Sequence, residues 1–245
     1  MKLDIKKGVG FESNMETESH RFSIGKNEDL FIDMFRNRLY SDKIKTPIQE
    51  YLSNAKDANV AAGRADVPLK ITLPTELEPN LRIRDFGNGV PPEKIGLFVT
   101  YGESDKRESN DFIGGFGIGS KSAWAYTDSF QVITYIDGVK RGYVSHIGRS
   151  QAGDLDKLSE SKTEEPNGTE IVIPVQIKDV RAFRKAVFYT TFFWEIKPIL
   201  LGILPEEIPD SYREIDKLLD YEDGYVLKNQ DDFFRYYDGR SYDKR

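Results

Sequence analysis

Three polar residues share one side of a helix predicted between residues 45 and 62. Glu50 and Asn54 are four positions apart and Asp57 follows three positions later, spacings that bring side chains together on one face of an α-helix. An amide oxygen is a good ligand for Mg²⁺, and a carboxylate one turn away can orient or deprotonate a water molecule. These residues predict metal-assisted attack by water. A solvated polar face on an amphipathic helix is the alternative.

A second acidic residue ends a predicted strand. Strand alternation puts Leu81, Ile83 and Asp85 on the same face. If the two apolar residues belong to the core, Asp85 also points inward, where a carboxylate is costly unless it accepts strong hydrogen bonds. The amino group of a purine is a suitable donor, and Gly87 and Gly89 allow the backbone to approach a flat ring. The alternative is a strand-ending aspartate followed by a glycine turn.

A glycine-rich segment leads into a short helix predicted near Ser120. Its form is Gly-x-x-Gly-x-Gly, and exposed amides at a helix start bind phosphate. The dinucleotide fingerprint has the reverse spacing, and the Walker loop has Lys directly after its last Gly, so neither matches. A flexible loop without function is the alternative. The residues expected at phosphate are Gly114, Gly115, Phe116, Gly117, Ile118 and Gly119.

Thr169 opens another predicted strand, directly after Asn167 and Gly168. Alternation puts its side chain on the face of Ile171 and Ile173, and an inward hydroxyl needs a hydrogen-bonding partner. A β-branched residue that merely begins a strand would look the same.

The rest of the chain mixes helices with antiparallel strands, which favours an α+β fold over a doubly wound sheet. Pro198 should end or kink the last predicted helix, and the Asp137-Gly138 pair predicts a hairpin turn. Helices are predicted at 28–40, 45–62 and about 178–197, strands at 68–73, 80–85, 129–136, 140–147 and 169–175, and loops at 87–119 and 149–168.

Composition excludes several classes of protein. The chain has no Cys and only two His, which excludes a disulfide scaffold, a thiolate zinc site and a His-based metal cage. Its net charge is −6, so bulk charge gives no support for tight nucleic-acid binding. The most apolar stretch, 186–204, is interrupted by Glu195, Lys197 and Pro198, so we expect a buried helix there and no membrane span. The charged first residues precede no apolar stretch, so no secretory signal is expected.

Together, the four chemical segments resemble the GHKL ATPases, the superfamily that includes gyrase, the large heat-shock chaperone, histidine kinases and MutL. Residues 50–58 are similar to its N box, and residues 85–89 to its Asp-x-Gly-x-Gly box. Residues 114–119 are similar to its second glycine box, and Thr169 to the threonine of its late Gly-Thr strand. The resemblance implies the Bergerat fold, a two-layer α/β sandwich whose mixed, mostly antiparallel sheet is covered by helices on one face.

The same resemblance implies ATP and Mg²⁺ as cofactors. Asn54 would hold the metal on the phosphates, Glu50 would activate the attacking water, and Asp85 would accept from the adenine amino group with Thr169 nearby. Asp57, Gly87 and Gly89 would shape the pocket wall, and residues 90–113 would form a mobile lid. Lys106 and Lys121 would be further contacts to phosphate, with a solvated lysine as the alternative for each.

Hydrolysis is expected to be slow. Gyrase and MutL relatives obtain a lysine from a following domain, and the 41 residues at 205–245 are too few for such a domain.

Composition divides the chain into an ATP-binding domain at 1–204, which includes an irregular arm at 1–26, and an acidic, Tyr-rich appendage at 205–245. A narrower resemblance covers about residues 20–200. The stretch at 108–113 before the glycine box and the stretch at 125–128 after it are similar to the N-terminal region of phage rIIA-type lysis-inhibition proteins. This resemblance implies a cytoplasmic protein acting on host defence or lysis timing, with a protein partner of the host and an ATP-dependent homodimer.

Two other functions are compatible with these residues. A histidine-type protein kinase would need an acceptor His on a dimerising helix, whereas His20 and His146 lie in strand-like or loop surroundings. A non-catalytic interaction module would keep the fold and bind a partner through its tail, where six Tyr gather. For these tyrosines, packing of the appendage onto the main domain is the simpler explanation.

Overall fold

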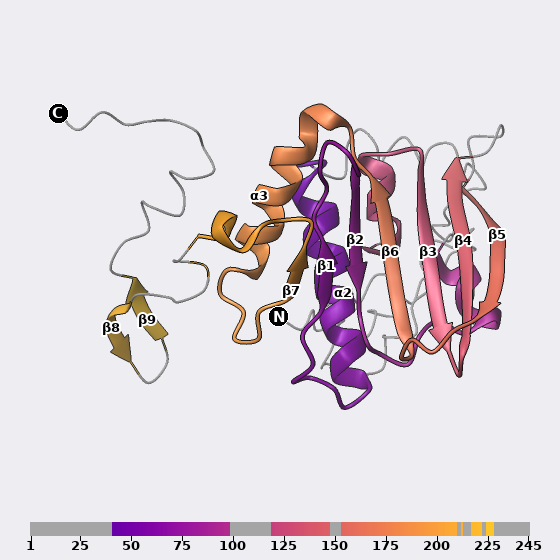
Figure 1. The fold of residues 1–245 in the computed structure, drawn as a ribbon, viewed down its shortest axis with the longest axis horizontal. Coiled ribbons are helices and arrows are strands. Elements are labelled where there is room, and N and C mark those ends of the chain that lie inside the picture. The colour runs from indigo at the N-terminus through magenta and orange to yellow at the C-terminus, as the bar shows by residue number, and fades with distance from the viewer. Residues whose placement is uncertain are drawn as a thin grey trace, which may run out of the picture.

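One sheet covered by two helices makes up the main body of the molecule. The computed structural model describes residues 41–98, 119–147, 153–209, 212, 217–221 and 224–227. Helices α2 (Lys45–Ala61) and α3 (Val180–Thr191) lie side by side on the same face of the sheet (Figure 1). The core lies between these two layers, where apolar side chains of α2, α3, β2 and β6 form one buried cluster. This arrangement is the predicted α+β sandwich.

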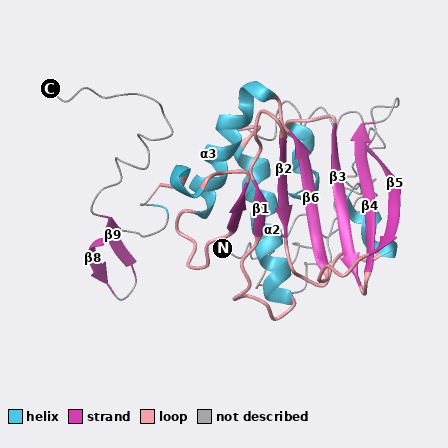
Figure 2. Ribbon diagram, in the orientation of Figure 1, coloured by secondary structure: helices cyan, strands magenta, loops and turns pink. Residues whose placement is uncertain are grey.

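Seven strands form the sheet, in the order β5-β4-β3-β6-β2-β1-β7 (Figure 2). All neighbouring strands are antiparallel except β1 and β7, which are parallel. The mixed, mostly antiparallel sheet is therefore as expected. Their bounds are β1 Lys70–Thr72, β2 Asn80–Arg84, β3 Ser129–Ile136, β4 Val139–Ile147, β5 Gly153–Lys162, β6 Gly168–Pro174 and β7 Ile199–Leu201.

The expected turn joins β3 and β4. Asp137 and Gly138 both have positive φ angles, of 48° and 77°, as a two-residue type I′ hairpin turn requires. The remaining elements are short. They are the 3-10 helices η2 (Pro92–Phe98), η3 (Gly119–Ala125), η4 (Ile177–Asp179) and η5 (Pro205–Glu207) and the separate hairpin of β8 (Lys217–Tyr221) and β9 (Gly224–Leu227).

Helix α2 forms where apolar periodicity predicted it. Ile48, Leu52 and Ala55 are buried on one side, at the spacing of a helix face. Before its first turn, the Asp42 carboxylate accepts hydrogen bonds from the backbone N–H groups of Ile44 and Lys45, at 3.0 and 2.7 Å. Such bonds satisfy amide groups that the helix itself leaves without partners.

Helix α3 ends earlier than predicted, at Thr191 rather than near Pro198. The hydroxyl of Thr190 donates to the Ala186 carbonyl and that of Thr191 to the Val187 carbonyl, each at 2.8 Å. Hydroxyls bonded back to the preceding turn weaken a helix slightly. The Lys197 ammonium then donates to the carbonyls of Thr191 and Phe192. These carbonyls would otherwise accept from the N–H groups of a following helical turn.

Two strands contradict the predicted loop at 149–168 and the predicted buried helix at 186–204. Strand β5 is largely charged and mostly exposed, so it lacks the apolar alternation by which strands are identified. It is an edge strand, and charges on an edge discourage pairing with other chains. Strand β7 follows Pro198, and its Ile199 and Leu201 side chains are 50% and 39% exposed.

Some predictions fall outside the described residues. The arm at 1–26, the helix at 28–40 and residues 99–113 of the predicted lid belong to this group. Within the described part of the chain, no helix is long and apolar enough to cross a membrane.

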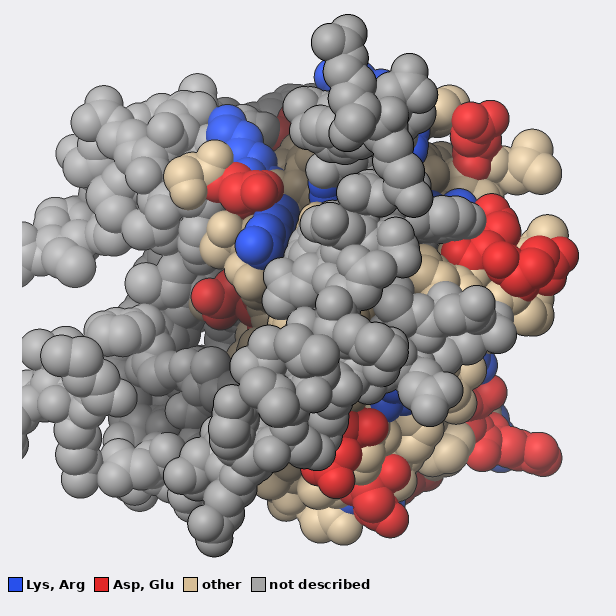
Figure 3. All heavy atoms as spheres, turned by 90° about the vertical axis from the view of Figure 1, so that its left-hand side faces the viewer, with Lys and Arg blue, Asp and Glu red and all other residues tan. Residues whose placement is uncertain are grey.

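Figure 3 shows one face of the molecule. Among the side chains of described residues that are visible there, both Lys or Arg groups (blue) and Asp or Glu groups (red) are present.

Candidate functional site

Asp85 lies at the end of β2, where the sheet meets the start of β6. Its backbone N–H donates to the Thr169 carbonyl at 2.9 Å. Its carboxylate oxygen Oδ1 accepts from the backbone N–H groups of Thr169 and Gly87, at 3.0 and 2.9 Å. Asp85 and Thr169 are both buried, on the helix-facing side of the sheet as alternation predicted. These hydrogen bonds join the end of β2 to the start of β6 around one inward-facing carboxylate, and we call this pair of bonds between Asp85 and Thr169 the Asp85 clasp.

The environment of Asp85 favours its neutral form. Burial raises the pKa of Asp85 from 3.8 to about 6, although the two backbone N–H groups and the Arg84 charge oppose the shift. At pH 7 the carboxylate is therefore ionised, at a cost in folding free energy. A carboxylate retained at such a cost is a candidate for function.

The glycines after Asp85 make room for neighbouring protein atoms. A Cβ on Gly87 would lie 2.8 Å from the Ala58 carbonyl oxygen of α2, closer than such atoms approach. Gly89 has a φ of +79°, and a Cβ there would lie 2.8 Å from the carbonyl oxygen of Tyr135. The loop after β2 is therefore pressed against α2 on one side and β3 on the other.

Two residues that sequence reasoning did not assign to the site hold this loop. Asn59 continues the apolar stripe of α2 and is buried. Its amide accepts from the Phe86 N–H at 2.7 Å and donates to the Val67 carbonyl at 2.9 Å. Arg64 donates to the Phe86 carbonyl at 2.6 Å. An amide within an apolar stripe was the available signal, because a buried amide needs hydrogen-bonding partners.

Glu50 and Asn54 approach the start of η3. A Cβ placed on Gly119 would lie 2.5 Å from Glu50 Oε2 and 3.3 Å from Asn54 Nδ2. The structure thus brings together the carboxylate, the amide and the last glycine of the glycine-rich segment. Burial raises the pKa of the Glu50 carboxyl. A half-buried carboxylate with a raised pKa is a better base toward water than an exposed one.

The loop after Asp85 and the Glu50 cluster lie along the same helix. Gly87 contacts Ala58, which is eight residues after Glu50. Eight residues of α-helix rise about 12 Å. A ligand that reached both groups would therefore extend along α2.

Asp57 and Lys121 are buried in this region. Asp57 is 5% exposed and Lys121 is fully buried. The alternative of a solvated Lys121 is therefore wrong, and so is a solvated face at Asp57. Each has an interaction within the protein, as buried charged groups require.

The rest of the predicted glycine cradle, Gly114, Gly115, Phe116, Gly117 and Ile118, lies outside the described residues, as does Lys106. Gly119 is the member of the cradle that the structure describes.

The donor set suits Mg²⁺ held mainly by a ligand's phosphates. The described residues contain no group of three His, Cys, Asp or Glu that could hold a metal by themselves. Mg²⁺ usually keeps several waters and takes only one or two protein oxygens beside substrate phosphates. Asn54, with Glu50 one turn away, fits that pattern.

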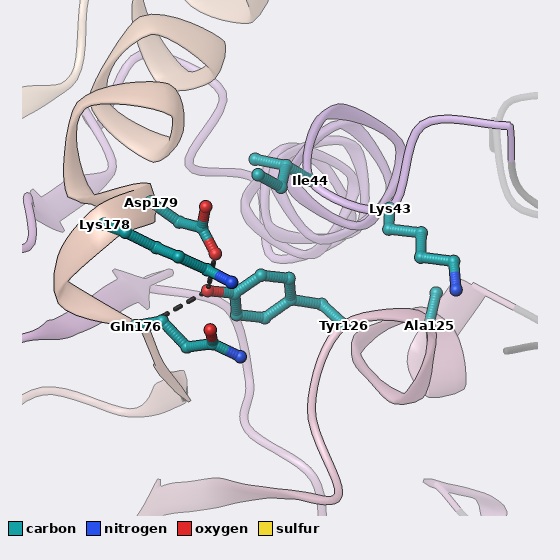
Figure 4. Close-up of a pocket in the computed structure, with 7 residues that line it drawn as sticks. All are labelled: Lys43, Ile44, Ala125, Tyr126, Gln176, Lys178 and Asp179. Carbon is teal, nitrogen blue, oxygen red and sulfur yellow. Dashed lines mark hydrogen bonds between the residues drawn. The ribbon is translucent and has the colours of Figure 1, made fainter.

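A separate hollow of about 480 Å³ lies at the other end of α2 (Figure 4). None of the predicted site residues lines it. Across it, the Tyr126 hydroxyl donates to Asp179 at 2.8 Å and accepts from the Gln176 N–H at 2.9 Å.

Comparison with known proteins finds distant relatives of two kinds. The chain is 26% identical to the chaperone protein HtpG of Clostridium acetobutylicum over 59% of its length, and 26% identical to that of Aliivibrio salmonicida over 66%. It is 34% identical to mitochondrial pyruvate dehydrogenase (acetyl-transferring) kinase 1 of Saccharomyces cerevisiae over 34% of its length. No protein-family model matches the chain.

These similarities support the GHKL superfamily at a distance, because chaperones and kinases are both among its members. They do not extend to whole proteins. The matches span 26% to 28% of the chaperones and 26% of the kinase. No similarity to phage proteins of the rIIA type is among these findings.

Proposed function

We propose that this chain is a Mg²⁺-dependent ATP-binding protein with slow ATPase activity. The observation that carries the proposal is the buried Asp85 carboxylate, clasped to Thr169 beside the helix that also presents Glu50 and Asn54. The distant similarity to chaperones and a kinase of the GHKL superfamily supports it independently.

Asp85 would recognise the adenine. The hydrogen bonds between described residues end on Oδ1, which leaves Oδ2 to accept from the exocyclic amino group. Because the purine amino group is a donor, the carboxylate must be ionised to accept fully from it. Discrimination against guanine follows, since guanine has a carbonyl at the same ring position.

Glu50 would act on the attacking water. It accepts the proton as the water oxygen bonds to the γ-phosphorus and the bond to the β-γ bridging oxygen breaks, which gives ADP and phosphate. Mg²⁺ held by Asn54 would supply charge stabilisation for the phosphates. Gly119 and the amides before it would contact the phosphates, and Lys121 would contribute charge nearby. Phosphoryl transfer also needs cationic stabilisation of the transition state, and related enzymes take that cation from a further domain. We therefore expect residues 1–245 on their own to turn ATP over slowly.

The test of hydrolysis separates binding from turnover. Purified protein should bind Mg²⁺-ATP by calorimetry and release labelled phosphate slowly. Glu50→Ala should retain binding and lose turnover, since its side chain acts on water rather than on the base. Thr46→Ala, one turn earlier on α2, is the matched control and should leave both unchanged. Normal hydrolysis by Glu50→Ala would show that the base is another residue.

The biological setting we propose comes from the narrower resemblance. ATP would close the lid at 90–113 and alter a protein-binding surface, a shift of population driven by different nucleotide contacts in the two states. The protein would act as an ATP-dependent homodimer in the cytoplasm of an infected cell, on a host partner in defence or lysis timing. If millimolar Mg²⁺-ATP fails to raise the melting temperature, the non-catalytic interaction module becomes the better function.

A further inference from the structure

Arg84 is buried although it points away from the helices. It precedes Asp85 on β2, so strand alternation puts the two side chains on opposite faces of the sheet. Arg84 is nevertheless only 5% exposed. Two residues earlier on the same face, the Arg82 side chain is 34% exposed. A buried guanidinium is retained only with good partners.

Aromatic rings surround the guanidinium. Its central carbon lies 4.1 Å from the centroid of the Tyr135 ring and 5.0 Å from that of Phe86. Cation–π contacts at these distances attract the guanidinium to the rings and help to hold it in place. Desolvation in this position lowers the pKa of Arg84, without threatening its charge at neutral pH.

The guanidinium ties together the two segments that form the Asp85 clasp. It donates one hydrogen bond to the Asp85 carbonyl and another to the Pro166 carbonyl, in the loop before β6. Gly168 lies directly beneath it, and a Cβ on Gly168 would overlap both the guanidinium and the Asp85 carbonyl. One side chain thus fixes the spacing between the end of β2 and the start of β6.

We propose that Arg84 is a positioning residue for the base-binding carboxylate. From the outer face of the sheet it holds the Asp85 backbone against Thr169 and places a fixed positive charge behind the carboxylate. This inference depends on the proposed function in one respect, which is that the Asp85 carboxylate binds the adenine base.

The charge of Arg84 gives this role a measurable signature. Arg84 is a positive charge that lowers the pKa of Asp85 against the effect of burial. Its removal should therefore raise that pKa and leave less carboxylate ionised at pH 7. Other ionisable groups near the pair include Tyr135 on β3, Glu165 in the loop before β6, Glu170 on β6, Arg64, which donates to the Phe86 carbonyl, and Asp57, which precedes the Ala58 that packs against Gly87.

The experiment measures Mg²⁺-ATP affinity between pH 5 and 8.5 in the full chain. Arg84→Met should weaken binding at pH 7 by about tenfold, as expected when charged hydrogen bonds in a buried site are lost, and should move the pH midpoint of binding upward by about one pH unit. Arg84→Lys keeps the positive charge but loses the paired N–H groups of the guanidinium. Its pH midpoint of binding should therefore stay unchanged while its affinity for Mg²⁺-ATP falls. Arg82→Met, on the same face and also beside Glu170 at 3.6 Å, is the control and should change affinity less than twofold.

Several outcomes would overturn the proposal. If Arg84→Met lowers only the melting temperature and leaves affinity and midpoint unchanged, Arg84 is structural and not a positioning residue. If Arg84→Met does not fold, unchanged affinity in Arg84→Lys overturns the proposal instead. If the unaltered protein fails to bind ATP, the proposed function fails, and an NMR titration of the Asp85 carboxyl without nucleotide then decides the role of Arg84. An equal Asp85 pKa in the unaltered protein and in Arg84→Met would exclude that role.

Discussion

At the scale of single residues, the ionised Asp85 carboxylate that we propose binds adenine also lowers the free energy of unfolding. Its carboxyl titrates at 3.8 when unperturbed and at about 6 in the folded protein. The folded state therefore holds the proton over a pH range in which the unfolded chain has lost it. As pH rises through this range, the free energy of unfolding falls, and above pH 6 the loss is complete, at about 3 kcal/mol.

Asp85→Asn should make the nucleotide-free protein more stable at pH 7.5. The amide oxygen can still accept from the Gly87 and Thr169 N–H groups, whereas the buried charge is gone. We expect the melting temperature to rise by several degrees and binding of Mg²⁺-ATP to be lost. The gain should shrink as pH falls from 6 and vanish below pH 4. A variant less stable than the original at pH 7.5 would show that ionised Asp85 stabilises the fold.

At the scale of elements, the contact between η3 and α2 decides where Glu50 lies. Gly119→Ala would place a Cβ 2.5 Å from Glu50 Oε2. Because that atom ends a flexible side chain, Glu50 can move aside at little cost in stability. We expect an almost unchanged melting temperature and a fall in ATP turnover of about tenfold to a hundredfold, as displaced catalytic groups produce.

Gly63→Ala is the control for this contact, because a Cβ on Gly63 meets no atom within 4 Å and the residue lies outside the proposed site and lid, so its positive φ of 69° affects stability alone. Thermal melts and phosphate release on the two variants make the comparison. A large loss of stability in Gly119→Ala would mean that η3 is fixed more rigidly than this account requires. Equal turnover in both variants would remove Glu50 from the reaction.

Periodicity predicted the elements that face the core and missed those that do not. Apolar spacing located α2, β2 and β6 because one face of each is buried, and this placed Asp85 and Thr169 correctly on the inner face. It could not find β5, whose side chains are mostly exposed. It could not indicate that aromatic rings bury Arg84 on the outer face, since that burial depends on pairing between strands far apart in sequence.

At the scale of the whole molecule, Tyr212 joins the appendage to the main body. It is buried, with its ring centroid 4.8 Å from that of Phe188 and its hydroxyl 2.8 Å from the Thr191 hydroxyl. Burial raises the pKa of Tyr212 to about 12, so the ring stays neutral. The packing expected of the appendage tyrosines is therefore found for Tyr212.

The division at residue 204 can be tested through this contact. Tyr212→Ala in the full chain should cost about 3–5 kcal/mol, as large core truncations do, and Tyr212→Phe about 1 kcal/mol for the lost hydrogen bond. Phe193→Ala, a nearby aromatic residue that is 57% exposed, should cost much less. A fragment of residues 1–204 lacks Tyr212. In denaturant titrations, its free energy of unfolding should therefore be about as low as that of Tyr212→Ala in the 245-residue chain. If the fragment is instead as stable as the full chain, the contact with Tyr212 contributes nothing and the boundary lies where the sequence predicted it.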